Sequence, residues 1–182
     1  MPPRARIAAI DYARTVALIG MAIYHFTYDL TLFGALPPGM ASQGVWQEFA
    51  RLVAGSFLAL SGVSLFLAQG HGLRLRPFLR RLAMVGLAAG AVSLATWVAM
   101  PEFFVFFGIL HSIAVSSVIG LAFLRAPGVV TLAAAVLFLA LPSVFRSLGL
   151  SPDWPMWLGL TELRRATMAF EPVFPWTGVF LA

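Results

Sequence analysis

The sequence contains no cysteine and no lysine, and only 10% of its 182 residues are charged. Without cysteine the chain forms neither disulfides nor thiolate metal sites, and thiol catalysis is excluded. Soluble domains average about 25% charged residues. Because 60% of the residues are hydrophobic and the mean hydropathy is +0.92, we expect an integral membrane protein without a sizeable soluble domain.

All twelve basic residues are arginines, and the formal net charge is +5. Nucleic-acid binding is not expected, because no basic and aromatic surface domain exists to carry it. In a membrane protein, an arginine excess first indicates orientation. The arginines gather at the N-terminus, between residues 69 and 81, and at Arg125. We therefore expect a multi-pass protein of the cell membrane with a cytoplasmic N-terminus.

The apolar segments predict an all-α, polytopic transmembrane helix bundle with five full spans plus a truncated sixth. The five spans are predicted at residues 7–33, 52–68, 82–100, 103–124 and 129–141. The final apolar run, residues 172–182, is too short to cross a bilayer. We therefore expect residues 1–182 to form a single transmembrane domain that is truncated at its C-terminus. Gly86 and Gly90 have the GxxxG spacing of closely packed membrane helices, which is a weak signal by itself.

The first predicted span carries four ionisable residues, Asp11, Arg14, His25 and Asp29. At about 100° per residue, Asp11 and Asp29 share one azimuth, and the other two lie within roughly 60° of it. This polar stripe is about 27 Å long, close to the thickness of a bilayer. Ionisable residues inside a membrane usually face a protein interior or a wet cavity, so the stripe is the first place to look for function.

With the N-terminus in the cytoplasm, His25 and Asp29 lie near the outer face, and His111 of the fourth span lies at a similar depth. Asp29 follows His25 by four residues and can orient its imidazole as a general base. We therefore predict that His25, Asp29 and His111 form a catalytic group. Each histidine could instead make only an interhelical hydrogen bond. A metal site formed by the three residues is a weaker alternative, and no metal is predicted.

At the cytoplasmic end, Arg14 and Asp11 are predicted to meet an anionic donor. Four further arginines would form a phosphate-binding rim there: Arg74, Arg76, Arg80 and Arg81. The alternatives are a simple ion pair between Asp11 and Arg14, and an arginine cluster that only sets topology and contacts anionic lipid.

Four segments occur in the order GMAIYHFTYDL, SGVSLFL, SLATWVAMPEFFVFFGILHSIAVSS and EPVFPWTGVFL. Together with the D-x-x-R run before them, they resemble bacterial members of the heparan-alpha-glucosaminide N-acetyltransferase catalytic-domain family. The spacing of Arg14 and His25 also resembles the R-x10-H signature in the first helix of acyltransferase-3 membrane proteins, a related group.

This resemblance implies a transmembrane acyltransferase of the N- or O-acetyltransferase type. Such an enzyme takes an acetyl or other acyl group from cytoplasmic acyl-CoA and transfers it to a sugar amine or hydroxyl on the outer face, as in a cell-envelope glycan. The resemblance implies that Arg14 contacts the donor and that His25 is the catalytic histidine. Two departures stand out: Thr15 replaces the glycine of many relatives, and no histidine lies between Asp29 and His71, where animal lysosomal members have their proposed active histidine.

Two other functions stay open. The polar stripe suits a proton or ion relay, so the chain could be a small permease or a proton- or ion-coupled transporter. It could also be an inactive fragment whose polar residues only hold helices together. The expected partners are the lipid bilayer, an acyl-CoA donor and a glycan or amino-sugar acceptor, with a homo-oligomer as a further option.

Overall fold

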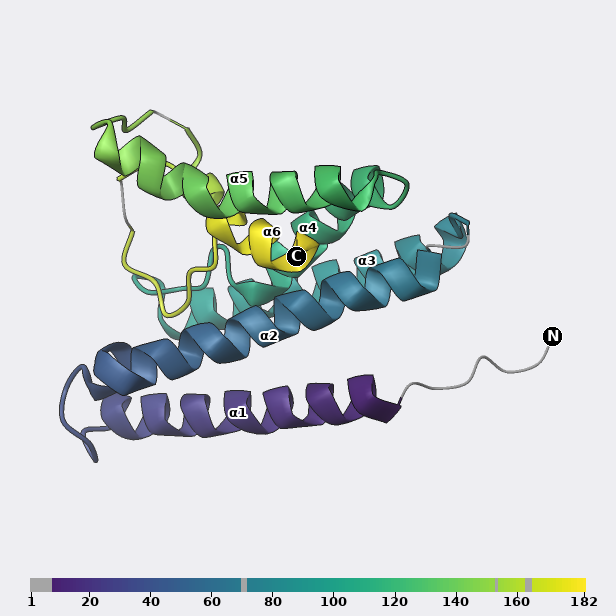
Figure 1. Cartoon of the computed structure of the whole chain (residues 1–182). Helices are drawn as coiled ribbons and strands as arrows, with labels where there is room; N and C mark the ends of the chain where they lie inside the picture. Colours follow the sequence, from purple (N-terminus) through teal and green to yellow (C-terminus); the bar gives the residue numbers. More distant parts are fainter. Residues whose placement is uncertain (1–7, 70–71, 153, 163–164) are drawn as a thin grey trace. The chain divides into compact units, whose positions relative to one another are not determined.

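The computed structural model describes residues 8–69, 72–152, 154–162 and 165–182. In these ranges the regular structure consists of six α-helices, two short 3-10 helices and one isolated β-bridge, which confirms the all-α prediction (Figure 1). The α-helices are α1 (Ala8–Leu32), α2 (Gly44–Gln69), α3 (Leu75–Ala99), α4 (Ile109–Phe123), α5 (Gly128–Ser147) and α6 (Val173–Leu181). The 3-10 helices are η1 (Met40–Ser42) and η2 (Met156–Leu158). His71 lies outside the described residues.

Three of the described helices, α2, α3 and α5, are long and apolar enough to cross a membrane, with mean hydropathies of 1.8, 1.9 and 2.3. The sequence predicts five such spans. Helix α1 ends within one residue of its predicted span, but its four ionisable residues and three tyrosines lower its hydropathy. Helix α4 has only 15 residues, or about 22 Å, against about 30 Å for the hydrocarbon core.

The helix that the sequence predicts from Phe103 begins six residues later, at Ile109. Residues 103–107 instead run alongside residues 167–171, with two backbone hydrogen bonds between the segments: Met168 N–H to Phe103 O at 2.8 Å and Glu171 N–H to Phe107 O at 3.1 Å. The polar backbone of this apolar run is therefore bonded to a distant segment, and the helix begins only at Ile109. The fifth span is longer than predicted, because α5 continues through Pro142 to Ser147.

The chain divides into two compact units, Met1–Leu60 and Ser61–Ala182, and each is described separately. In the first unit, α1 packs on the first half of α2 at Gly20. A Cβ added to Gly20 would lie 2.9 Å from Val53 Cγ2 and 3.5 Å from Phe49 Cζ. A larger residue at position 20 would therefore require the Val53 side chain to move.

The second unit is built around α6, which lies against α4 and α5 (Figure 1). Glycines provide the space for this short helix. A Cβ at Gly62 of α2 would overlap the carbonyl oxygen of Phe180, and a Cβ at Gly178 would lie 2.8 Å from Ala135 O. Thr177, which is fully buried, hydrogen bonds to Ser116 of α4 at 2.8 Å. The core of this unit therefore combines close backbone contacts with a buried hydroxyl pair.

Candidate active site

The polar stripe of α1 lies on the exposed side of its helix. Because α1 is continuous from Ala8 to Leu32, the four ionisable residues share one face, as the sequence predicts. All four are exposed. The buried residues of α1 lie between roughly 120° and 180° from the azimuth of Asp11 and Asp29. These buried residues are Ala17, Gly20 and Thr27. Within the first unit, the stripe therefore points away from the contact with α2.

At the start of the stripe, Arg14 Nη1 lies 3.6 Å from Asp11 Oδ1. This is the i,i+3 ion pair predicted from the sequence as the alternative to binding of an anionic donor by Arg14 and Asp11. The two side chains are 44% and 56% exposed, and exposed pairs of this kind contribute only about 0–1 kcal/mol. Thr15 stands where many relatives have glycine. It donates its hydroxyl to the backbone carbonyl of Asp11, one turn earlier in the helix, at 2.9 Å.

At the other end of the stripe, His25 contacts Tyr24 edge to face, with ring centroids 5.8 Å apart. Asp29 follows one helical turn later, where Cβ atoms are about 5–6 Å apart. Within the described part of α1, no hydrogen bond joins His25 to Asp29. The carboxylate is therefore near the imidazole but does not orient it in this structure.

His111 lies in the first turn of α4, and both of its ring nitrogens have polar neighbours. Gly108, the N-cap residue of α4, donates its backbone N–H to Nδ1 at 3.3 Å. Nε2 lies 3.4 Å from Ser93 Oγ on α3. Through Nδ1 the ring caps its own helix, and through Nε2 it contacts α3. The second contact is the interhelical hydrogen bond that the sequence analysis gave as the alternative to catalysis.

Two hydroxyl groups of α3 hold the segment that precedes α4. Ser93 donates its hydroxyl to Val105 O at 2.6 Å, and Thr96 Oγ1 accepts the Val105 N–H at 3.0 Å. Both backbone polar groups of Val105 are therefore satisfied by side chains. Sequence reasoning did not identify Ser93 or Thr96 as site residues, although their i,i+3 spacing places them on one face of α3.

An aromatic stack adjoins His111. The Phe107 ring lies beside both His111 and Trp157, with centroid distances of 5.5 and 5.7 Å and interplanar angles of 32° and 27°. Phe106 stacks on Phe170 at 5.3 Å. The sequence analysis did not include Phe107 or Trp157 in the site, because their contact joins segments that lie fifty residues apart in the chain.

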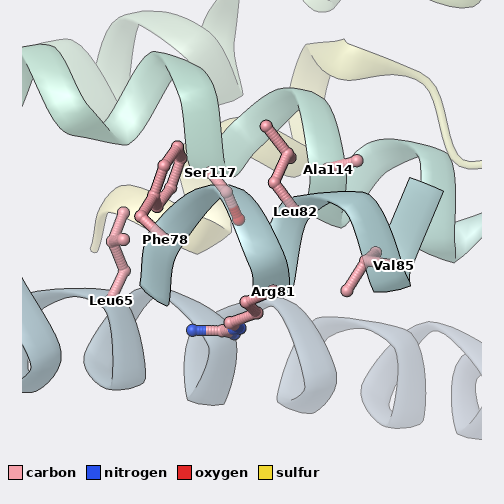
Figure 2. Close-up of a pocket in the computed structure, with 7 residues that line it drawn as sticks. All are labelled: Leu65, Phe78, Arg81, Leu82, Val85, Ala114 and Ser117. Carbon is pink, nitrogen blue, oxygen red and sulfur yellow. The ribbon is translucent and has the colours of Figure 1, made fainter. Parts of the chain in front are cut away.

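The predicted phosphate-binding arginines lie at the N-terminal end of α3. Arg74, Arg76 and Arg80 are exposed, and Arg81 is half-buried. Arg81 lines a small hollow with six other residues (Figure 2): Leu65, Phe78, Leu82, Val85, Ala114 and Ser117. The hollow has a volume of about 10 Å³, which is room for about one water molecule. It cannot hold a phosphate group without movement of its walls.

A larger recess lies between the C-terminal ends of α2 and α4. Its volume is about 480 Å³, within the range of roughly 300–1,000 Å³ for small-molecule sites. Gln69, Leu73, Leu121 and Arg125 are among its lining residues. Sequence reasoning used Arg125 only for orientation and did not include it among the site residues.

Residues 6–182 match the family model described as "Heparan-alpha-glucosaminide N-acetyltransferase, catalytic". The chain belongs to this family. Membership confirms the resemblance found in the sequence and, with three helices of membrane-spanning character, indicates a multi-pass member of a membrane N-acetyltransferase family. Neither the curated proteins nor the solved structures give a match to the chain.

In this member of the heparan-alpha-glucosaminide N-acetyltransferase family, three of the four resembling segments meet inside the second unit. SGVSLFL supplies Gly62, the segment around α4 supplies Ser116, and EPVFPWTGVFL supplies Thr177 and Phe180. The fourth segment carries His25 and Asp29 and belongs to the first unit. The predicted meeting of His25 with His111, and of Arg14 with the arginines of α3, therefore stays a prediction.

Proposed function

We propose that the protein is an integral membrane acyltransferase that moves an acetyl or other acyl group from cytoplasmic acyl-CoA to a sugar amine or hydroxyl on the outer face. Family membership over nearly the whole chain is the observation that carries this proposal. The polar stripe of α1 supports it, since transfer across a membrane needs polar groups near both faces, and the stripe is about as long as the bilayer is thick.

In the proposed topology, α1 and α4 cross the membrane together with α2, α3 and α5, and the N-terminus is cytoplasmic. The short α4 completes its crossing with the non-helical segment that precedes it, residues 103–108. This backbone is acceptable at membrane depth because its polar groups are bonded within the protein, as at Val105.

The donor end is assigned to Arg14, with Asp11 holding its guanidinium in place. The CoA phosphates would be bound by a basic rim consisting of Arg74, Arg76, Arg80 and Arg81. Guanidinium groups suit this task because they bind phosphate oxygens in a bidentate manner and keep their charge at any physiological pH.

The acceptor end is assigned to His25. Asp29, one helical turn away and not hydrogen bonded to the ring in this structure, would orient the imidazole after a change of side-chain rotamer. His25 takes the proton of the acceptor amine or hydroxyl as the acceptor nitrogen or oxygen attacks the thioester carbonyl. The tetrahedral intermediate then collapses, the C–S bond breaks, and the proton passes to the departing CoA sulfur. His111, with Ser112 or Ser116, would donate hydrogen bonds to the oxyanion that forms.

The test is transfer of labelled acetyl from acetyl-CoA to glucosamine by the purified protein in liposomes. His25→Ala should abolish transfer. Ile19→Ala is the matched control, because Ile19 is 55% exposed on the same helix but lies off the stripe. Undiminished transfer by His25→Ala would refute the role of this histidine. A CoA-independent flux driven by a pH gradient would instead favour a transporter.

A further inference from the structure

The groups around His111 determine where its proton resides. Nδ1 receives the backbone N–H of Gly108, and because an amide N–H can only donate, Nδ1 must be the unprotonated nitrogen. Ser93 has one hydroxyl hydrogen, and it is directed to Val105 O at 2.6 Å. On the side facing Nε2, Ser93 Oγ can therefore only accept, and Nε2 must carry the hydrogen.

From this we infer that Ser93 is a positioning residue that, with the Gly108 N–H, locks His111 as the neutral Nε2–H tautomer, so that His111 serves as a hydrogen-bond donor and not as a second base. This inference rests on the proposed function and refines the role given there to His111. The two constraints come from different elements, since Gly108 precedes α4 and Ser93 belongs to α3.

The lengths of the Ser93–Val105 and His111–Ser93 contacts are consistent with a His111 N–H that can change its hydrogen-bond acceptor. The Ser93–Val105 bond is short at 2.6 Å, whereas Nε2 lies 3.4 Å from Ser93, at the long end of hydrogen bonding. The hydrogen bond from Nε2–H to Ser93 is thus weak. The Nε2–H can exchange Ser93 for an oxyanion as its acceptor without the loss of a strong hydrogen bond. The lone pair of Nδ1, which a base would need, is already occupied by Gly108.

Nitrogen-15 NMR of the histidine-labelled full-length protein in nanodiscs tests the tautomer directly. The His111 signal is assigned as the one missing in His111→Gln. The inference predicts a protonated Nε2 and an unprotonated Nδ1 in the wild type. In Ser93→Ala the Gly108 N–H still keeps a proton off Nδ1, so the tautomer stays the same, but the Nε2 signal shifts because the Nε2–H loses its acceptor. Ser93→Thr should restore the wild-type signal. The control Thr96→Val removes the neighbouring hydroxyl but leaves Ser93, so it should keep the wild-type tautomer. A protonated Nδ1 in the wild type, or an unchanged signal in Ser93→Ala, overturns the inference.

A kinetic comparison separates donor from base. The glutamine amide N–H₂ can replace the Nε2–H as a donor, but glutamine cannot act as a base. His111→Gln should therefore stay within about tenfold of wild-type transfer, while His111→Ala loses about 10²–10³-fold, as for loss of one oxyanion donor. Equal loss in both variants, with both folded, contradicts the donor role. If the wild type transfers no acetyl group, the proposed function fails, and NMR still decides the tautomer.

Discussion

Substitution of Gly62 tests how α6 is held in the second unit. A methyl group at Gly62 would overlap the carbonyl oxygen of Phe180 and lie 3.0 Å from its carbonyl carbon. Because both atoms belong to the backbone, no rotamer change relieves the contact, and α6 must shift. Gly86 of α3 is the matched control, since nothing lies within 4 Å of a Cβ added there.

The expected free-energy changes have opposite signs. Overpacking of a core typically costs about 1–3 kcal/mol, and we take the upper value because the obstacle is backbone. Alanine is favoured over glycine in a helix by about 1 kcal/mol. Gly62→Ala should therefore lower the free energy of unfolding by about 2 kcal/mol, and Gly86→Ala should leave it unchanged or raise it by up to about 1 kcal/mol.

The assay is reversible unfolding in mixed micelles, followed by tryptophan fluorescence, because Trp176 lies within α6. The reasoning predicts an earlier transition for Gly62→Ala and an unchanged or later one for Gly86→Ala. It is refuted if Gly62→Ala is as stable as the wild type. It is equally refuted if both variants lose the same free energy, because the loss would then not depend on the contact with Phe180.

Two further predictions concern hydroxyl groups. Ser116→Ala should lower the free energy of unfolding by about 1–3 kcal/mol because it leaves Thr177 buried without its partner. Ser112→Ala should leave the free energy of unfolding unchanged or raise it by up to about 1–3 kcal/mol, because it removes a hydroxyl that is buried without a partner among the described residues. Denaturation of both variants in parallel checks this, and equal losses would contradict it. Thr96→Val should cost about 1 kcal/mol and speed hydrogen exchange at the Val105 amide, which loses its acceptor, and unchanged exchange would rule out the bond.

The sequence predicts the helices that local composition determines. Helix α1 ends at Leu32, within one residue of its predicted end, because Gly34 adopts a positive φ of 76° and two prolines follow at positions 37 and 38. The shared face of the stripe follows from helix geometry alone. The sequence could not show that, within the first unit, this face points away from α2, because that depends on Gly20 meeting Val53.

The features missed from the sequence depend on contacts between distant segments. Hydropathy alone cannot distinguish the apolar run FFVFFG from the start of a helix. Its non-helical form depends on partners about sixty residues later, such as Thr167, which donates its hydroxyl to Phe104 O at 2.8 Å. The contact between Ser93 and His111 likewise joins two helices. Serine is too common in membrane helices to predict such a contact by itself.

The central proposal is that this chain transfers an acyl group across a membrane with His25 as the base. The most direct measurement is incorporation of labelled acetyl from acetyl-CoA into glucosamine by wild-type protein and His25→Ala in the same liposomes. The proposal predicts incorporation by the wild type and by Ile19→Ala, and none above background by His25→Ala. Absence of incorporation by folded wild-type protein, or equal incorporation by His25→Ala, would contradict it.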